Sequence, residues 1–202
     1  MVLGCVGLFL VSIQGFAVTE SAATQYGLVP SALARGEYYR LLTAMFLHGN
    51  LPHLLINLFF LYTFGDNREE RYGALRYLLL YLACGLVGGL ASSGLGLAEQ
   101  MDTPRIGASG AISGLLGAYL VSFPRTRLVM AIPFFRFLPL VIRWRVWAFL
   151  LMWVGLNIIG WTQQQGYYSV DYLAHLGGFV TGVVAGCALV LARQASLVGA
   201  EA

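Results

Sequence analysis

The sequence predicts an all-α membrane protein, a bundle of six transmembrane helices. Of its 202 residues, 58% are hydrophobic and only 10% are charged. The mean hydropathy of +0.74 is far above that of ordinary soluble domains. This length accommodates about six spans of roughly 20 residues with short connections. We therefore expect one membrane domain over residues 1–202, embedded in a lipid bilayer.

Six apolar stretches define the expected spans. In chain order they are Val2–Val18, Leu51–Phe64, Ala74–Leu97, Ser109–Phe123, Val146–Trp161 and Tyr172–Ala192. The first lacks the basic flank of a signal peptide, so we expect it to be a retained span. A further apolar stretch, Leu128–Ile142, contains Pro133, Pro139 and, at its centre, Arg136. A seventh span there would bury a charge and two helix breaks, so an interfacial segment is expected instead.

The distribution of arginine predicts the orientation of these spans, because the chain has no lysine. Nine arginines follow the second, fourth and sixth spans, whereas the opposite side has only three, Arg35, Arg40 and Arg105. The positive-inside rule then places both termini in the cytoplasm, with the inner cell membrane as the expected location. The arginines form no basic run, so a nucleic-acid partner is not expected.

Polar residues occur inside three of the expected spans. Ser109 opens the fourth span within Gly107-Ala108-Ser109-Gly110, His53 and Asn57 lie in the second, and His175 lies near the start of the sixth. At 1.5 Å per residue, Ser109 falls roughly 8 Å below the outer boundary of the hydrocarbon core. The same estimate brings all four residues to the outer third of the bilayer, where such groups usually mark function.

Small residues predict close contact between the fourth and sixth spans. The sixth span repeats a small residue every four positions, at Ala174, Gly178, Gly182 and Gly186, and the fourth answers with Gly110, Gly114 and Ala118. This pattern lets helix backbones approach closely. Simple packing would explain the glycines alone, but the same contact would also bring His175 to Ser109.

The residue types fit serine acyl transfer. Ser109 is the expected nucleophile, and His175 the base that removes its proton. The Ser109 backbone N–H, the Asn57 amide and a His53 ring N–H could stabilise the oxyanion. Asp171 is expected at the outer interface, so a Ser–His dyad is inferred rather than a triad. Taken singly, each residue has a structural explanation, which stays open for Asn57 as an interhelical hydrogen-bonding group.

Two other sets of residues are assigned structural roles. His48 precedes the second span and is expected to be structural. Cys5, Cys84 and Cys187 lie in apolar stretches, where packing rather than a disulfide framework is expected. No cofactor or metal is expected for this chemistry.

The chain resembles the rhomboid intramembrane serine proteases over essentially its whole length. The matching motifs are His48-x4-His53-x3-Asn57, Gly107-Ala108-Ser109-Gly110 and Ala174-His175-x2-Gly178. The resemblance implies that Ser109 is the nucleophile and His175 the base, with His53 and Asn57 at the oxyanion site. It also implies membrane-anchored substrates cut in or near a transmembrane helix, and a cavity open to the outer side that admits water to Ser109.

Further segments are interpreted through the same resemblance. Gly65–Gly73 is similar to a family turn on the cytoplasmic side, and Tyr38-Tyr39-Arg40 stands where relatives often carry Trp-Arg. The fifth span and the loop Trp161–Tyr168 are expected to form a gate and a cap. Ser113 departs from the family, since many relatives have a tyrosine there that stacks on the catalytic histidine.

Two alternative functions belong to different classes. A catalytically inactive rhomboid-like protein could bind or escort membrane proteins, although such proteins typically lack the serine or the histidine. A small-solute transporter or channel would instead be expected to show paired charges or a broken-helix repeat near mid-membrane. Neither feature is visible in the sequence.

Overall fold

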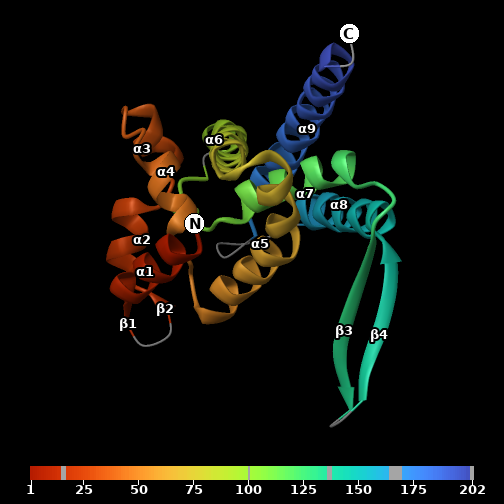
Figure 1. The fold of residues 1–202 in the computed structure, drawn as a ribbon. Helices are drawn as coiled ribbons and strands as arrows, with labels where there is room; N and C mark the ends of the chain where they lie inside the picture. The colour runs from red at the N-terminus through yellow and green to blue at the C-terminus, as the bar shows by residue number, and fades with distance from the viewer. Residues whose placement is uncertain (15–16, 100, 136–137, 164–169, 201–202) are drawn as a thin grey trace.

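The molecule is mostly helical, and its long helices form one bundle (Figure 1). The computed structural model describes residues 1–14, 17–99, 101–135, 138–163 and 170–200. The bundle helices are α5 (Leu51–Tyr72), α6 (Ala74–Ala98), α7 (Ser109–Ser122), α8 (Val146–Gln163) and α9 (Tyr172–Ala200). Each begins within one residue of the expected start of its span.

Three of the described helices contain segments long and apolar enough to cross a membrane: Ala74–Ala98, Val146–Gln163 and Tyr172–Ala195. Three further apolar helical segments are shorter: Val2–Ser12, Leu51–Gly65 and Ser109–Ser122. The six apolar stretches of the sequence are therefore all at least partly helical. That all six cross a bilayer remains a prediction.

The N-terminal span is shorter than predicted. Helix α1 covers only Val2–Ser12, and β1 (Ile13–Gln14) then pairs antiparallel with β2 (Ala17–Val18). Eleven residues of α-helix extend roughly 16 Å, about half of a hydrocarbon core. The chain leaves the helix at Ile13, which has an extended backbone with ψ of 151°.

The segment between α1 and α5 is folded around one buried arginine. It contains α2 (Glu20–Tyr26), α3 (Pro30–Ala34), α4 (Arg40–Thr43) and a 3₁₀ turn, η1 (Ala44–Phe46). Arg40 is only 7% exposed and donates hydrogen bonds to the carbonyl oxygens of Thr24 (2.7 Å) and Gly27 (2.9 Å). It also pairs with Glu37 at 2.8 Å. Arg40 therefore joins the start of α4 to the end of α2.

Helix α5 continues past the predicted turn. The span was expected to end at Phe64, but the backbone stays helical through Gly65 and ends at Tyr72. Gly73 then has φ of +82°, a conformation that favours glycine, and α6 begins directly after it. The chain therefore reverses direction at Gly73, the last residue of the Gly65–Gly73 motif, rather than at Gly65, its first residue.

Helix α7 lies at the centre of the bundle. All ten residues from Gly110 to Tyr119 are buried. The predicted glycine contacts are confirmed: a Cβ on Gly178 would collide with the Gly110 carbonyl oxygen, and one on Gly182 with the Gly114 carbonyl oxygen. The backbones of α7 and α9 are thus in direct contact, as small residues allow.

Two hydrophobic cores flank α7. One joins α1, α5, α6 and α7 around Phe9, Leu54 and Tyr81, and the other joins α5, α7, α8 and α9 around Phe64 and Leu150. None of the three cysteines forms a disulfide; Cys5 and Cys84 are buried and Cys187 is exposed. Cys84 packs against Gly114, so its role here is close packing.

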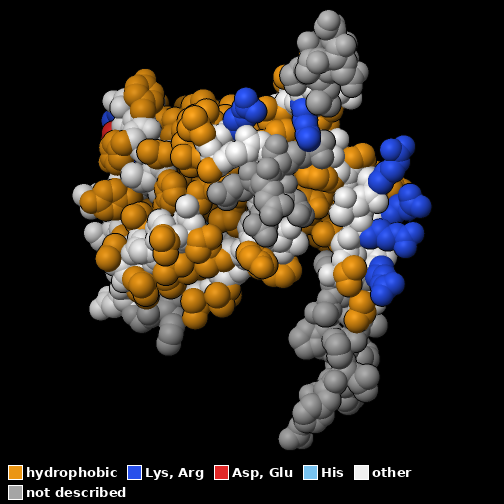
Figure 2. Space-filling model, viewed as in Figure 1, with side chains coloured by type: hydrophobic (Ala, Val, Ile, Leu, Met, Phe, Trp, Pro, Cys, Tyr) orange, Lys and Arg blue, Asp and Glu red, His pale blue; other side chains and the backbone are white. Residues whose placement is uncertain are grey.

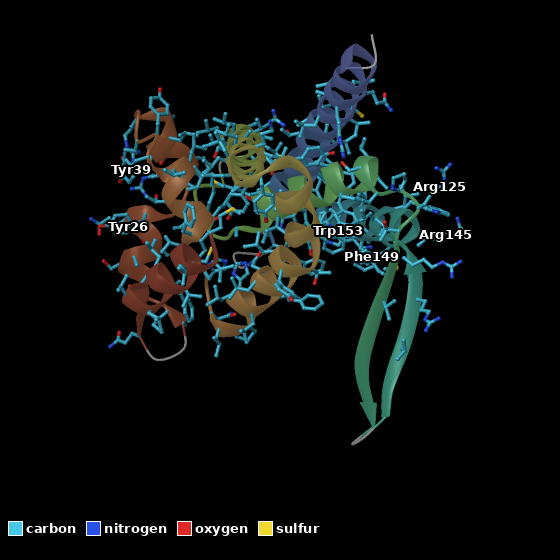
Figure 3. The ribbon with its side chains drawn as sticks, viewed as in Figure 1. Tyr26, Tyr39, Arg125, Arg145, Phe149 and Trp153 are labelled. Carbon is cyan, nitrogen blue, oxygen red and sulfur yellow. The ribbon has the colours of Figure 1, made fainter. Side chains whose placement is uncertain are left out.

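Between α7 and α8 the chain forms an antiparallel hairpin, β3 (Arg127–Phe135) with β4 (Leu138–Arg145), that extends away from the bundle (Figure 1). The prediction that Leu128–Ile142 is not a seventh helical span is confirmed. Leu128 and Trp144 pair at its base and pack on the second core. Arginine side chains gather beside this base (Figure 2), where Arg125 and Arg145 point away from the bundle (Figure 3).

Candidate active site

Ser109 is the first residue of α7 and is half-buried. The chain reaches it through Gly107, whose φ of +131° is accessible to glycine and strained for other residues. The Gly107 N–H donates to the Ala44 carbonyl oxygen at 2.9 Å, which ties this loop to η1. Ser113, one turn later, donates its hydroxyl to the Ser109 carbonyl oxygen at 2.6 Å, so it serves its own helix.

The His53 ring lies against the same glycine. A Cβ on Gly107 would be 3.0 Å from Nε2 of His53 and 3.6 Å from Oγ of Ser109, so both side chains border this position. The Gly49 N–H donates to Nδ1 of His53 at 3.3 Å. A neutral imidazole carries one hydrogen, so this contact leaves the hydrogen on Nε2. His53 therefore presents a donor on the side of Ser109.

Asn57 lies one turn after His53 and is 5% exposed. Its Nδ2 donates to the His53 carbonyl oxygen at 2.9 Å. An amide nitrogen has two hydrogens, so one donor remains for another acceptor. Part of the hydrogen-bonding capacity of Asn57 is thus used within α5.

His175 is oriented by α8. Its Nδ1 lies 2.7 Å from Oδ1 of Asn157, while Nδ2 of Asn157 donates to the Trp153 carbonyl oxygen at 2.8 Å. Because a carbonyl only accepts, that second contact fixes the amide with its oxygen toward the histidine. Nδ1 of His175 is then the donor, and Nε2 holds the lone pair of a base.

Two aromatic rings contact the imidazole of His175. The Trp153 ring stacks on the imidazole with centroids 5.9 Å apart and planes at 30°, and Tyr172 approaches edge-on at 6.3 Å. Figure 3 shows Trp153 and Phe149 extending from α8 where it meets the other bundle helices. The aromatic partner missing at Ser113 is therefore supplied by Trp153 from a different helix.

The start of α9 is fixed by Asp171. Its carboxylate accepts the Ser92 hydroxyl at 2.6 Å and the Ala174 N–H at 3.1 Å. Arg105 lies 3.9 Å from the same carboxylate and donates to the Ser92 hydroxyl at 2.7 Å. Asp171 thus caps α9 and joins it to α6 through the hydrogen bonds of its carboxylate.

The residues next to Ser109 and His175 in the sequence bring the two halves of the site together. A Cβ on Gly110 would lie 3.3 Å from the carbonyl oxygen of Ala174 and 3.5 Å from its Cβ. Gly110 directly follows Ser109, and Ala174 directly precedes His175. Ser109, His53 and His175 are each only partly buried.

His48 is fully buried next to this group. Its ring meets that of His53 edge-on, with centroids 5.2 Å apart, and its Nδ1 donates to the Phe46 carbonyl oxygen at 3.2 Å. Burial, and then the charge of His53, lower the pKa of His48 to about 4, against the opposing effect of the Phe46 carbonyl. A neutral, inward-facing ring agrees with the structural role expected for His48.

The family model described as the rhomboid domain matches residues 35–192, a range that includes every residue of this site. The chain belongs to the rhomboid family. It is therefore an integral membrane protein, which its apolar helices fit.

Curated relatives of this rhomboid occur in bacteria and in eukaryotes. It is 31% identical to rhomboid protease GluP of Bacillus subtilis over 92% of this chain and 33% of that protein. It is 38% identical to the putative rhomboid protease YdcA of the same species, over 50% of this chain and 48% of the relative. RHOMBOID-like protein 6, mitochondrial, of Arabidopsis thaliana is 31% identical over 78% of this chain and 46% of the relative. The chain thus matches about a third to a half of the length of these proteins.

Sequence reasoning missed the partners of His175. Asn157 is a lone amide in an apolar span, the same signal that selected Asn57. Its spacing of four residues from Trp153 places both on one helix face, which could have indicated a joint role. Most of the predicted cap, residues 164–168, lies outside the described residues. Within the part of the chain that is described, no group of three or more His, Cys, Asp and Glu is placed to hold a metal ion.

Proposed function

We propose that this rhomboid is an intramembrane serine endopeptidase that cuts peptide bonds in or near transmembrane segments of membrane proteins. Ser109 is the nucleophile and His175 the general base of a dyad. The observation that carries the proposal is the orientation of His175, whose Nε2 holds the lone pair on a helix in backbone contact with that of Ser109. The protease names of its relatives also support it.

The proposed reaction proceeds by acyl transfer. Nε2 of His175 takes the Ser109 hydroxyl proton as Oγ attacks the scissile carbonyl. The oxyanion that forms accepts hydrogen bonds from Nε2–H of His53, the remaining amide N–H of Asn57 and the Ser109 backbone N–H. His175 then gives its proton to the departing amine, which leaves an acyl-enzyme on Ser109. Water, deprotonated by His175, releases the second product.

The membrane arrangement is part of the same proposal. Four exposed arginines, Arg125, Arg127, Arg143 and Arg145, lie at the end of α7 opposite Ser109. Their positive charge favours the cytoplasmic side, so Ser109 would face a water-filled cavity open to the outer side, with both termini cytoplasmic. Single cysteines in a cysteine-free background test this: we expect outside labelling at position 164 and protection at 127. The reverse pattern would put the active site on the cytoplasmic side.

The activity is tested with the purified protein in detergent or vesicles and a model transmembrane substrate. We expect cleavage by the wild type and none by Ser109→Ala that remains folded. A serine-directed phosphonate should label the wild type at Ser109 and fail to label His175→Ala. Cleavage at the full rate by Ser109→Ala would refute the mechanism. Stable substrate binding with no cleavage by the wild type would favour the inactive escort protein instead.

A further inference from the structure

The outer half of α8 is held to the bundle differently from its inner half. The buried residues of α8 are Val146, Phe149, Leu150 and Asn157, so only a polar one belongs to the outer half. Around it, Leu156, Ile158 and Ile159 are 57%, 45% and 50% exposed. Apolar packing thus fixes the inner half of α8, whereas a buried amide marks its outer half.

Both polar groups of the Asn157 side chain form hydrogen bonds. Nδ2 bonds to the Trp153 carbonyl of its own helix and Oδ1 bonds to Nδ1 of His175. Burial of an amide is unfavourable unless its polar groups form hydrogen bonds. For Oδ1 of Asn157 the partner on α9 is His175. Gly160 adds a close contact to Tyr172, because a Cβ there would collide with the tyrosine ring.

We infer that Asn157 is a positioning residue: it fixes the His175 tautomer with the lone pair on Nε2, and it makes that state depend on α8 lying against α9. The inference rests on the proposed function of Ser109 and His175. Displacement of the outer half of α8 removes the acceptor from Nδ1 and the stacked Trp153 ring at the same time. The imidazole is then free to rotate or to move its hydrogen to Nε2, where it no longer serves as a base.

The first experiment uses Asn157→Leu, which removes the acceptor at similar size, and Asn157→Asp, which keeps an oxygen facing Nδ1. Leu156→Ala, on the exposed side of the same turn, is the matched control. We expect Asn157→Leu to lower kcat by about 10- to 100-fold with little change in KM. The loss is smaller than the roughly 10⁴-fold effect of a wrong histidine tautomer where a carboxylate is the partner, because an amide supplies no charge. Asn157→Asp should recover part of it.

Labelling by a small phosphonate separates positioning from substrate entry, since the probe needs the nucleophile and base but no room for a helix. Asn157→Leu should slow labelling in parallel with kcat, and Leu156→Ala should leave it unchanged. Labelling at the wild-type rate in Asn157→Leu would overturn the inference, because Asn157 would then act only on the movement of α8.

A spectroscopic measurement tests the tautomer without any activity. The chain has three histidines, so ¹⁵N-histidine labelling gives three ring systems, assigned with single histidine variants. We expect His175 to carry its hydrogen on Nδ1 in the wild type and to lose that preference in Asn157→Leu. An Nε2–H tautomer in the wild type would overturn the inference. If the tautomer is as expected but the wild type does not cleave, the proposed function fails and the positioning of His175 stands.

Discussion

The two histidines beside Ser109 are held as opposite tautomers. His53 on α5 accepts from the Gly49 N–H at Nδ1 and so carries its hydrogen on Nε2, whereas His175 on α9 donates from Nδ1 to Asn157 and keeps its Nε2 lone pair. One ring is prepared to donate a hydrogen bond and the other to accept a proton. In the proposed mechanism the same side chain would thus serve two tasks, according to what contacts its Nδ1 atom.

The largest effect is expected when the two histidines are replaced one at a time, which tests whether His175 is the base and His53 an oxyanion donor. We expect His175→Ala to lower kcat/KM by at least about 10⁴-fold, because the proposed mechanism assigns the Ser109 proton to His175, and Nδ1 of His53 already accepts from the Gly49 N–H. His53→Ala should retain far more activity, since other oxyanion donors remain. Turnover measured per folded molecule decides the order. Equal losses in the two variants would contradict the division of roles.

The second prediction concerns His53 and Asn57 as hydrogen-bond donors to the oxyanion. Loss of one oxyanion donor typically costs about 10²–10³ in rate. With a third donor at the Ser109 N–H, we expect the double variant Asn57→Ala/His53→Ala to lose at least about tenfold in kcat. The melting temperature and active-site-titrated turnover should be measured on one preparation. Reduced stability with normal turnover would make both residues structural.

The third prediction tests the dependence of His175 on helix contact. A Cβ at Gly182 would collide with the Gly114 carbonyl oxygen, so Gly182→Ala should force α9 away from α7. Overpacking of this kind typically costs about 1–3 kcal/mol, so we expect a lower melting temperature and slower phosphonate labelling. Gly155→Ala on α8, where a Cβ meets no atom within 4 Å, is the matched control and should change neither.

The last prediction concerns the pH dependence of stability at the third histidine, His48. The pKa of His48 is lowered from 6.5 to about 4 in the folded protein, chiefly by burial. Between these values the unfolded chain binds more protons, so stability is lost as the pH falls from about 6.5 toward 4. At 1.36 kcal/mol per pKa unit the loss reaches about 3 kcal/mol.

The matching measurement is a set of melting temperatures between pH 7 and pH 4.5. Replacement of the ring by an amide in His48→Gln should flatten the pH dependence, even if the variant is less stable throughout. An unchanged slope in His48→Gln would show that other groups cause the acid sensitivity.

Much of this arrangement could be predicted from the sequence because hydropathy and small-residue spacing act over whole helices. The starts of α5 to α9 and the contact of Gly178 with Gly110 follow from such patterns. The end of α5 was wrong, because a motif containing Gly65 was interpreted as the turn although the helix continues to Tyr72. The decisive residue is Gly73, because a glycine with positive φ directly after a helix is a common helix end, and this signal was overlooked in favour of Gly65.

Part of the candidate site could be predicted because short motifs mark individual residues. Motifs on three separate helices indicated Ser109, His53, Asn57 and His175, whose catalytic roles stay predictions. Asn157 carried the signal of a lone amide in an apolar span, but no motif linked it to His175, which lies 18 residues later on another helix. Only the crossing of α8 and α9 brings the two together, and that depends on tertiary packing rather than on local spacing.

The burial of α7 has a consequence for how the protein is made. A helix whose ten central residues all contact protein has no lipid-facing side, and its glycines and serines gain little from hydrocarbon. We expect α7 to insert poorly as an isolated segment during synthesis and to be retained by α6 until α9 emerges. Packing of Ser109 into the bundle would then be among the last steps of biogenesis. A chain truncated before Tyr172 should accordingly leave α7 accessible to the aqueous phase.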